Sequence, residues 1–310
     1  MKRRKFIQVL TLAGVSAVFA EKSMIAADFA RRESQKAFKA KAGFSAWQLP
    51  SQLNTIGNSY VFLTRSGKVI VMDGGKKAEA PFLRGFLAAL GGKVDAWFIS
   101  HPHTDHIGAL TEILKEPSGL EISHIFHSRL SDEMIEMDTI DRDNCKEAYA
   151  LLDSSHIPVT DIRQTGGEYD FGGMKLKVLG VANDEIHNNA YNNSSMILRV
   201  WDRKKSIVFL GDAGIECGDK VLNGPYRHLL DCDYLQMAHH GQRGCSEQFY
   251  KSIKFRVCLW PTPLWVWNND RSGKGINTGT LETFETRRWM DEIGITEHHV
   301  SCLEGVWRLD

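Results

Sequence analysis

The feature that most constrains this chain is the run His101-Pro102-His103-Thr104-Asp105-His106, in which four side chains can bind a metal ion. Neutral imidazole nitrogens and carboxylate oxygens are ligands that zinc and similar divalent metals prefer. The run follows an apolar segment, residues 94–100, that is typical of a strand, and precedes a helical pattern at 107–114. The run is therefore expected on a strand-to-helix loop, where functional groups usually gather. The alternative is a histidine-rich loop that binds no metal.

Polar residues of the same kinds follow three other predicted strands. Asp73 follows the strand 69–72, Asp212 follows the strand 206–210, and His239 and His240 follow the strand 234–238. A single carboxylate in such a place is also typical of a turn or a helix cap. Because each group comes at the end of an apolar strand, all of them could lie on one rim of the sheets. The sequence therefore predicts a metal site assembled from several strand ends.

Strands and helices alternate in two halves of the chain. Residues 60–64 and 69–72 flank Arg65-Ser66-Gly67-Lys68 as a predicted hairpin, and residues 81–90 have helical spacing before Gly91-Gly92. The second half repeats this style with strands at 174–179, 196–200, 206–210, 234–238 and 257–260, and an amphipathic helix at 280–293. The pattern predicts an α/β fold with two sheets packed together and helices outside.

The order of these motifs resembles the metallo-β-lactamase superfamily, from about Gly57 to the end of the chain. The resemblance implies a four-layer αββα sandwich with a one- or two-metal site at one edge. Within the superfamily, the chain is most similar to the hydrolase domain of ComEC, the competence DNA-uptake channel, and to its secreted stand-alone relatives. The matching segments are Gly57-Asn58-Ser59, residues 192–199, Leu210-Gly211-Asp212-Ala213 and His239-His240-Gly241.

The resemblance implies a set of metal ligands, with one or two zinc ions expected and manganese or iron as alternatives. One ion would be held by Asp105, His106, Asp212 and His239, and His239 is preferred to His240 because it comes first after the strand. Asp105 is the expected catalytic residue, which would orient a metal-activated hydroxide or transfer a proton.

The other ion would be held by His101, His103 and the shared Asp212. Many members of the superfamily carry a further histidine here, whereas this chain has Asn192, with His187 just upstream, as candidates to complete the site. Asp73 is expected to support the histidine loop through hydrogen bonds.

The expected function is that of a metal-dependent hydrolase, with a phosphodiester as the favoured substrate. A lactone or other ester is the first alternative, and a metal- or ligand-binding protein without turnover is the second. A β-lactam is less favoured because the further histidine is missing. Lys and Arg together number 38, as do Asp and Glu, so the neutral chain argues against a long or stable nucleic-acid partner.

The N-terminal segment predicts export. Residues 1–27 combine Arg3-Arg4 with a short apolar run and resemble a twin-arginine signal, with a general secretory signal as the alternative. Residues 28–43 are interpreted as a linker and residues 44–310 as the hydrolase domain. We expect a periplasmic or extracellular protein without a membrane span after signal removal. The six cysteines fit buried thiols or one or two disulfides equally well.

Residues 260–269, Trp260-Pro261-Thr262-Pro263-Leu264-Trp265-Val266-Trp267-Asn268-Asn269, are unusually aromatic. A loop that lines the core explains such a segment, because aromatic side chains offer large surfaces for burial. The other interpretation is a wall of the substrate pocket beside the metals.

Overall fold

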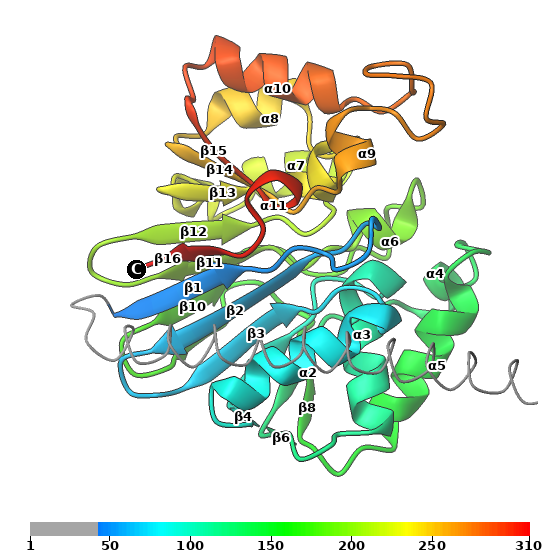
Figure 1. Ribbon diagram of the computed structural model, residues 1–310, viewed down its shortest axis with the longest axis vertical. Helices are drawn as coiled ribbons and strands as arrows, with labels where there is room; N and C mark the ends of the chain where they lie inside the picture. The colour runs from blue at the N-terminus through cyan, green and yellow to red at the C-terminus, as the bar shows by residue number, and fades with distance from the viewer. Residues whose placement is uncertain (1–42) are drawn as a thin grey trace, which may run out of the picture.

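The computed structural model describes residues 43–310 and contains two seven-stranded sheets packed face to face (Figure 1). The predicted export signal and all but the last residue of the predicted linker lie outside the described residues. The first sheet has the order β16-β1-β2-β3-β5-β7-β8, with strands at Trp307–Leu309, Phe44–Gln48, Ser59–Thr64, Val69–Asp73, Ala96–Phe98, Ile125–His127 and Val159–Asp161. The second has the order β15-β14-β13-β12-β11-β10-β9, with strands at Glu297–Val300, Val257–Trp260, Tyr234–Gln236, Ser206–Phe209, Leu198–Trp201, Lys175–Val178 and Glu168–Asp170. A small third sheet pairs β4 (Lys93–Val94) with β6 (Glu121–Ile122).

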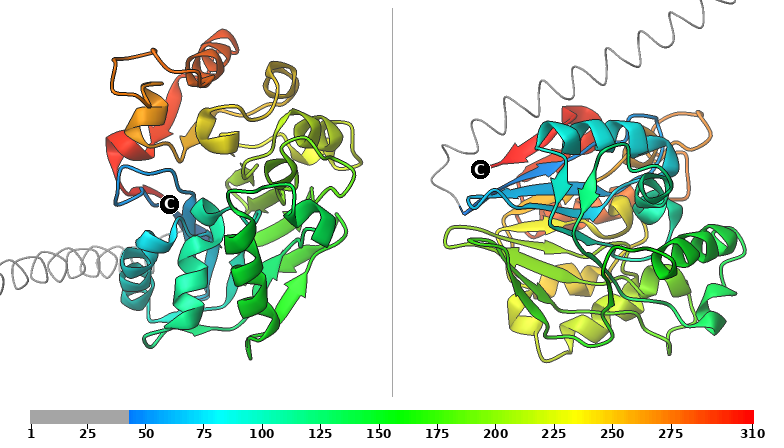
Figure 2. Two further views of the ribbon diagram at one scale, coloured as in Figure 1. Left: turned by 90° about the vertical axis from the view of Figure 1, so that its right-hand side faces the viewer. Right: turned by 90° about the horizontal axis from the view of Figure 1, so that it is seen from below.

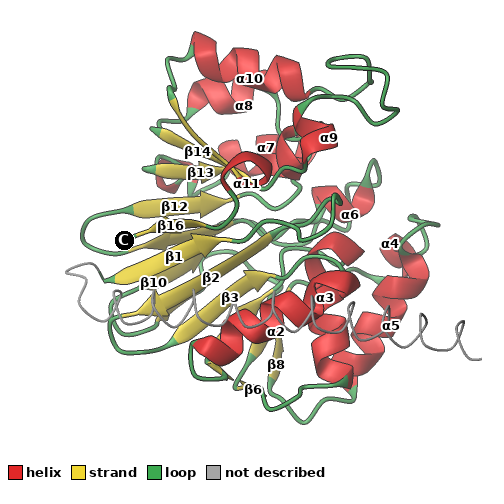
Figure 3. Cartoon of the chain, in the orientation of Figure 1, coloured by secondary structure: helices red, strands yellow, loops and turns green. Residues whose placement is uncertain are grey.

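Helices cover the outer face of each sheet, which gives the predicted four-layer αββα sandwich (Figures 2 and 3). The helices are α2 (Ala80–Ala89), α3 (Thr104–Lys115), α4 (Asp132–Ile135), α5 (Arg142–Asp153), α6 (Ala190–Asn193), α7 (Ile215–Leu222), α8 (Glu247–Ser252), α9 (Leu264–Trp267), α10 (Thr283–Glu292) and α11 (Ser301–Glu304). Three single turns of 3₁₀ helix are η1 (Lys77–Glu79), η2 (Arg227–Leu229) and η3 (Ala238–Gly241).

Three apolar cores hold the four layers together. One lies between the first sheet and α2, α3 and α5, one lies between the sheets, and one lies between the second sheet and α7, α8 and α10. Alternate residues of a strand point to opposite faces of its sheet. In β3, Val69 and Val71 face the helices whereas Ile70 and Met72 face the second sheet. This two-sided burial explains why the strand is apolar throughout.

The strand directions bring the predicted site residues to one edge of the sandwich. In the first sheet, β1 runs in the same direction as β3, because each is antiparallel to β2, and β5 and β7 are parallel to β3. In the second sheet, β12, β13, β14 and β15 are parallel to one another. The loops that follow the carboxyl ends of these strands therefore meet at a common edge, which we call the metal edge.

The six cysteines, all within residues 43–310, are free thiols, and four of them are buried. In this part of the chain the structure therefore favours buried thiols over the disulfides that the sequence left open. Over the same residues, no helix combines the length and apolar character needed to cross a bilayer.

Candidate metal centre

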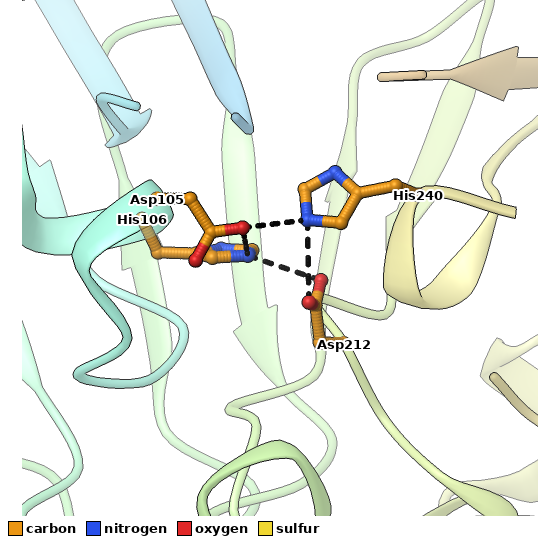
Figure 4. Close-up of side chains that lie close together, drawn as sticks. All are labelled: Asp105, His106, Asp212 and His240. Carbon is orange, nitrogen blue, oxygen red and sulfur yellow. Dashed lines mark ion pairs between the residues drawn. The ribbon is translucent and has the colours of Figure 1, made fainter. Parts of the chain in front are cut away.

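Four side chains come together at the metal edge, those of Asp105, His106, Asp212 and His240 (Figure 4). Asp105 and His106 are adjacent at the start of α3, Asp212 follows β12, and His240 lies in η3. His106 Nε2 lies 3.0 Å from Asp212 Oδ1. His240 Nε2 lies 3.1 Å from Asp105 Oδ2 and 3.3 Å from Asp212 Oδ2. All four residues are buried, with between 0% and 8% of their surface exposed. Two imidazoles and two carboxylates in this arrangement form a set of ligands suited to a divalent metal.

Three polar atoms at the centre of this cluster make no hydrogen bond within the described part of the chain, although each lies within ion-pair distance of another member of the cluster. They are His106 Nε2, His240 Nε2 and Asp212 Oδ1. Buried polar groups are nearly always paired, because an unpaired one costs roughly 1–3 kcal/mol. Three such atoms that converge on one point are therefore explained best by a ligand that all of them share. The residues present fit a metal ion on this ground.

Hydrogen bonds on the far side of each ring orient these histidines. His106 Nδ1 lies 2.8 Å from Asp73 Oδ2, and His240 Nδ1 lies 2.8 Å from the carbonyl oxygen of Pro261. Because both partners are acceptors, each Nδ1 donates its proton and leaves the Nε2 lone pair directed into the cluster. Such partners fix the ring and strengthen it as a ligand.

Asp73 supports the histidine loop as the centre of a hydrogen-bond network. Its Oδ1 accepts from the backbone N–H of Ser100 at 2.7 Å. Its Oδ2 accepts from Asn58 Nδ2 at 2.7 Å and from the Ser100 hydroxyl at 2.9 Å, in addition to His106. The carboxylate is 2% exposed and makes no direct contribution to the four-residue cluster. It therefore lies behind the candidate metal ligands and is hydrogen-bonded to the histidine loop.

A second group consists of His101, His103 and Asp212. His101 Nε2 and His103 Nδ1 lie 2.9 Å apart, and His103 Nε2 contacts Asp138 Oδ2 at 3.0 Å. The His103 ring lowers the pKa of Asp138 to about 2, so this carboxylate is ionised and can only accept a hydrogen bond. The Nε2–H of His103 therefore donates to Asp138, and in the neutral ring Nδ1 keeps its lone pair on the side of His101. Asp212 belongs to both groups, as a carboxylate shared by two ions would.

Sequence reasoning missed two of the supporting residues. Asp138 lies in an irregular loop after α4 with no motif around it, so no sequence signal marks it. Ser195 accepts the backbone N–H of Asp212 at 3.0 Å, and its hydroxyl lies 3.4 Å from His101 Nδ1. Ser195 belongs to the segment 192–199, which carries the ComEC resemblance. That resemblance was the signal that could have marked Ser195 as a supporting residue.

The remaining candidates lie around the centre rather than within either group. His239 Nε2 is 3.8 Å from Asp212 Oδ2, so the structure brings His240, and not the preferred His239, into the four-residue cluster. Asn192 is 4% exposed with an unpartnered Oδ1, and its Nδ2 lies 3.4 Å from His239 Nε2. His187 is exposed and belongs to neither group.

The two carboxylates dominate the electrostatics of the cluster. Burial would lower the pKa of His106, but the charges of Asp212 and Asp73 outweigh it and raise that pKa well above its usual value. Burial would also lower the pKa of His240, but the charges of Asp212 and Asp105 outweigh burial and raise that pKa to about 9. For His101, burial prevails and lowers the pKa. The strongly negative centre therefore attracts positive charge, which a metal ion would supply in place of protons.

The backbone around the ligands is unusually constrained. Asp73, His239 and His240 all have left-handed conformations, with φ of 55°, 51° and 56°. Such conformations in residues other than glycine cost about 1–3 kcal/mol each and gather at functional sites. Gly211 precedes Asp212 with φ of 55°, and a Cβ there would lie 2.9 Å from Ser195 Oγ. A larger residue would therefore displace the hydroxyl that positions Asp212.

The aromatic segment 260–269 begins at the end of β14, in the core. Trp260 is fully buried and packs against Gly241, where an added Cβ would lie 2.4 Å from the indole ring. The carbonyl of Pro261 then binds His240, as described above, and Leu264 is 46% exposed at the surface. The segment therefore begins in the core and supports one candidate metal ligand.

Comparisons with known proteins agree with this fold and site. Residues 54–131, which include Asp73 and the histidine run, match the family model of the metallo-β-lactamase superfamily. YhfI from Bacillus subtilis, a metallo-β-lactamase fold protein, has 14% sequence identity and a TM-score of 0.53, over 86% of this chain and 100% of its own. No curated protein sequence gives a significant match.

A second solved structure is a variant of the CmlA β-hydroxylase, with 11% identity and a TM-score of 0.50, over 87% of this chain and 54% of its own. The chain thus spans about half the length of CmlA, which is a diiron enzyme from Streptomyces venezuelae. At these identities the two structures show a shared fold. The family model and the fold together support the metallo-β-lactamase superfamily, and the residue cluster supports use of a divalent metal.

Proposed function

We propose that this protein is a metal-dependent hydrolase whose centre is the cluster Asp105, His106, Asp212 and His240, with His101 and His103 beside it. The observation that carries the proposal is the convergence of three buried, unpartnered polar atoms on one point. A bound divalent metal supplies Lewis acidity and makes water a nucleophile at neutral pH. Members of the superfamily are generally hydrolases of this type, which supports the proposed hydrolase function.

The residues of the chain have separate roles in this proposal. Asp212 belongs to both ligand groups and would hold two ions at a fixed separation. The side chain of Asp105 is 12% exposed, more than the other three side chains of the cluster, so a substrate or a water molecule can approach it most easily. It can therefore orient the attacking water and accept its proton. Asp73 and Asp138 would keep the histidine rings in place throughout the reaction.

We favour a phosphodiester substrate, in line with the resemblance to the ComEC hydrolase domain and its secreted relatives. Two ligand groups that share one carboxylate suit in-line displacement at phosphorus, where two metals stabilise the attacking and leaving oxygens. Export through a twin-arginine signal is part of the same proposal, since that route carries proteins already folded around their metals.

The proposal is tested by metal analysis and a substrate panel. Elemental analysis of purified protein should find one or two divalent ions per chain. Chromogenic phosphodiesters, lactones and a β-lactam should then show turnover for at least one phosphodiester. The double variant Asp105→Ala, Asp212→Ala should lose both metal and turnover. Activity that survives this double substitution would refute the assigned centre.

One observation favours a second function, that of a metal- or ligand-binding protein without turnover. The group around His101 contains only three residues, and Asn192 stands where many relatives have a histidine. Incomplete ligation weakens metal binding, so this ion could be absent in solution. Metal bound without turnover of any substrate in the panel would favour this second function.

A further inference from the structure

The exposed apolar side chains of this protein gather at one edge of the sandwich. Over residues 43–310, the large hydrophobic residues with more than a third of their surface exposed are Leu53, Met137, Ile140, Ile215, Leu264, Ile276 and Leu303. Every one of them lies in a connection that follows the carboxyl end of β1, β7, β12, β14 or β15. These connections form the metal edge, which faces the viewer in the left view of Figure 2.

The opposite edge has a different character. Its hairpin turns at 65–68 and 202–205 contain only charged residues, one serine and one glycine, and the turn at 171–174 keeps Phe171 and Met174 buried. A folded protein exposes single apolar residues anywhere on its surface, but a one-sided distribution around a site indicates a binding surface. The one-sided distribution therefore marks the metal edge as a candidate binding surface.

Part of this edge forms a groove of about 550 Å³ between the loop 50–57 and the segment 261–264, with α11 at its end. Leu53 comes from one wall, Pro263 and Leu264 come from the other, and Cys302 closes the end. No lining residue carries a charge, although the metal centre nearby holds two buried carboxylates. The volume is that of a site for a small organic group.

The walls of the groove are fixed to the metal centre by hydrogen bonds. Thr262 donates from its hydroxyl to the carbonyl oxygen of His240 at 2.7 Å. On the other side, the backbone N–H of Asn58 donates to the carbonyl oxygen of Asp105 at 3.0 Å. The buried Glu79 carboxylate accepts from Ser51 Oγ at 2.6 Å and from the Gln52 N–H at 2.9 Å, which holds the loop in place. The groove is thus preformed beside the reacting centre.

From these observations we propose that the substrate carries an uncharged, apolar arm that lies in this groove while its ester reaches the metals. This inference rests on the proposed hydrolase function. A polynucleotide is a poor fit because its charged backbone requires basic side chains, and the groove has none. An amphiphilic phosphoester or ester, with a polar scissile group and a hydrocarbon tail, matches both parts of the edge.

The first test measures binding rather than turnover, so that it does not depend on the reaction. Octylphosphonate and methylphosphonate are titrated into the zinc-loaded protein by calorimetry. Because each buried methylene contributes about 0.8 kcal/mol, burial of only two would give roughly a tenfold tighter complex. We expect octylphosphonate to bind at least tenfold more tightly than methylphosphonate. Equal affinities would overturn the inference.

A pair of matched variants locates the arm. Leu264→Asp places a charge in the groove, whereas Ile276→Asp places one at a 69% exposed position of the same connection, outside the groove. Both sites are exposed, so both variants should fold, which the melting temperature checks. We expect the preference for octylphosphonate to be lost in Leu264→Asp and kept in Ile276→Asp. If both variants lose it, the whole edge is a docking surface and the groove assignment is wrong.

Two further measurements separate this inference from its premises. The kcat/KM ratio of octyl to methyl 4-nitrophenyl phosphate should exceed ten, and a ratio near one with good turnover would refute the arm while leaving the hydrolase intact. Turnover of neither substrate would count against the proposed function, and the phosphonate titration would still decide on the groove. Sedimentation with phosphatidylcholine vesicles is compared between the wild type and Leu264→Asp. If both sediment to the same extent, the edge binds a membrane surface and the substrate assignment is overturned.

Discussion

His239 and His240 are adjacent in sequence but are placed differently at the metal centre. His240 is fully buried, and its Nε2 lies between Asp105 and Asp212, whereas His239 Nε2 lies 3.8 Å from Asp212 and outside the four-residue cluster. We therefore expect His240→Ala to remove the ion of the four-residue cluster and to lower the metal content by about one ion per chain. His239→Ala is the matched control and should keep that ion. Elemental analysis of both variants decides, and equal metal losses would contradict the geometry.

Asp73 acts on the metal only through its hydrogen bonds. In Asp73→Asn the side chain keeps its size but loses its charge and one acceptor for the His106 ring and Ser100. Loss of such a supporting carboxylate typically weakens metal binding by about 10- to 100-fold. Competition with a chromogenic chelator should show this decrease. Asp95→Asn is a suitable control, because Asp95 also accepts a backbone N–H, that of Val69, but lies away from the centre. A similar decrease in both variants would argue against a specific role of Asp73.

At the scale of secondary-structure elements, the tight turn after β13 depends on a glycine. Gly241 has φ of 78°, and a Cβ there would lie 2.4 Å from the Trp260 ring. Gly67 has a similar φ of 82° but nothing within 4 Å. We expect Gly67→Ala to lower the free energy of unfolding by about 1 kcal/mol, the cost of a left-handed alanine. Gly241→Ala adds steric overlap and should cost about 3 kcal/mol or more. Urea unfolding of both variants measures the difference, and equal losses would show that the indole moves aside freely.

The elements that the sequence predicted well are those with a strong local pattern. The hairpin of β2 and β3 and the helices α2, α3 and α10 lie within a few residues of their predicted bounds. The segment 94–100 was expected as one strand but is divided, because β4 pairs with β6 in the small third sheet while β5 joins the main sheet. That division is set by partners distant in the sequence. Local periodicity carries no information about them.

For the candidate site, too, the sequence predicts what depends on local pattern and not what depends on distant contacts. The strand-end positions of Asp73, Asp212 and the histidine run were readable because an apolar strand precedes each one. Which of two adjacent histidines points inward was not readable, because it depends on consecutive left-handed residues at 239 and 240. The contact between Asp138 and His103 joins two irregular loops, so only the folded chain reveals it. Ligand identity therefore needs backbone geometry, whereas the location of the site does not.

At the scale of the whole molecule, the sandwich separates stability from function. Its three cores lie between the layers, whereas the candidate metal ligands and the exposed apolar residues lie in the connections at one edge. Parallel strands make this possible because their carboxyl ends meet at the same edge. Loops at that edge can differ in sequence without a change in the packing of the sheets. The groove beside the metals is one product of this freedom.

The metal should also contribute to the stability of the whole domain. Asp105 and Asp212 are buried beside each other, and their ion pairs within residues 43–310 are with histidines rather than with Lys or Arg. A cation that binds only the folded state adds about 2.7 kcal/mol at a concentration 100-fold above its Kd. For a domain of this size, we therefore expect chelation to lower the melting temperature by roughly 5–10 °C. Calorimetry with and without a chelator, followed by restoration with zinc, measures this shift. The double variant Asp105→Ala, Asp212→Ala should melt at the same temperature in both conditions, because its centre has lost the charges that attract the ion. A wild-type protein that loses its metal without any change in melting temperature would show that the ion is not bound at this buried centre.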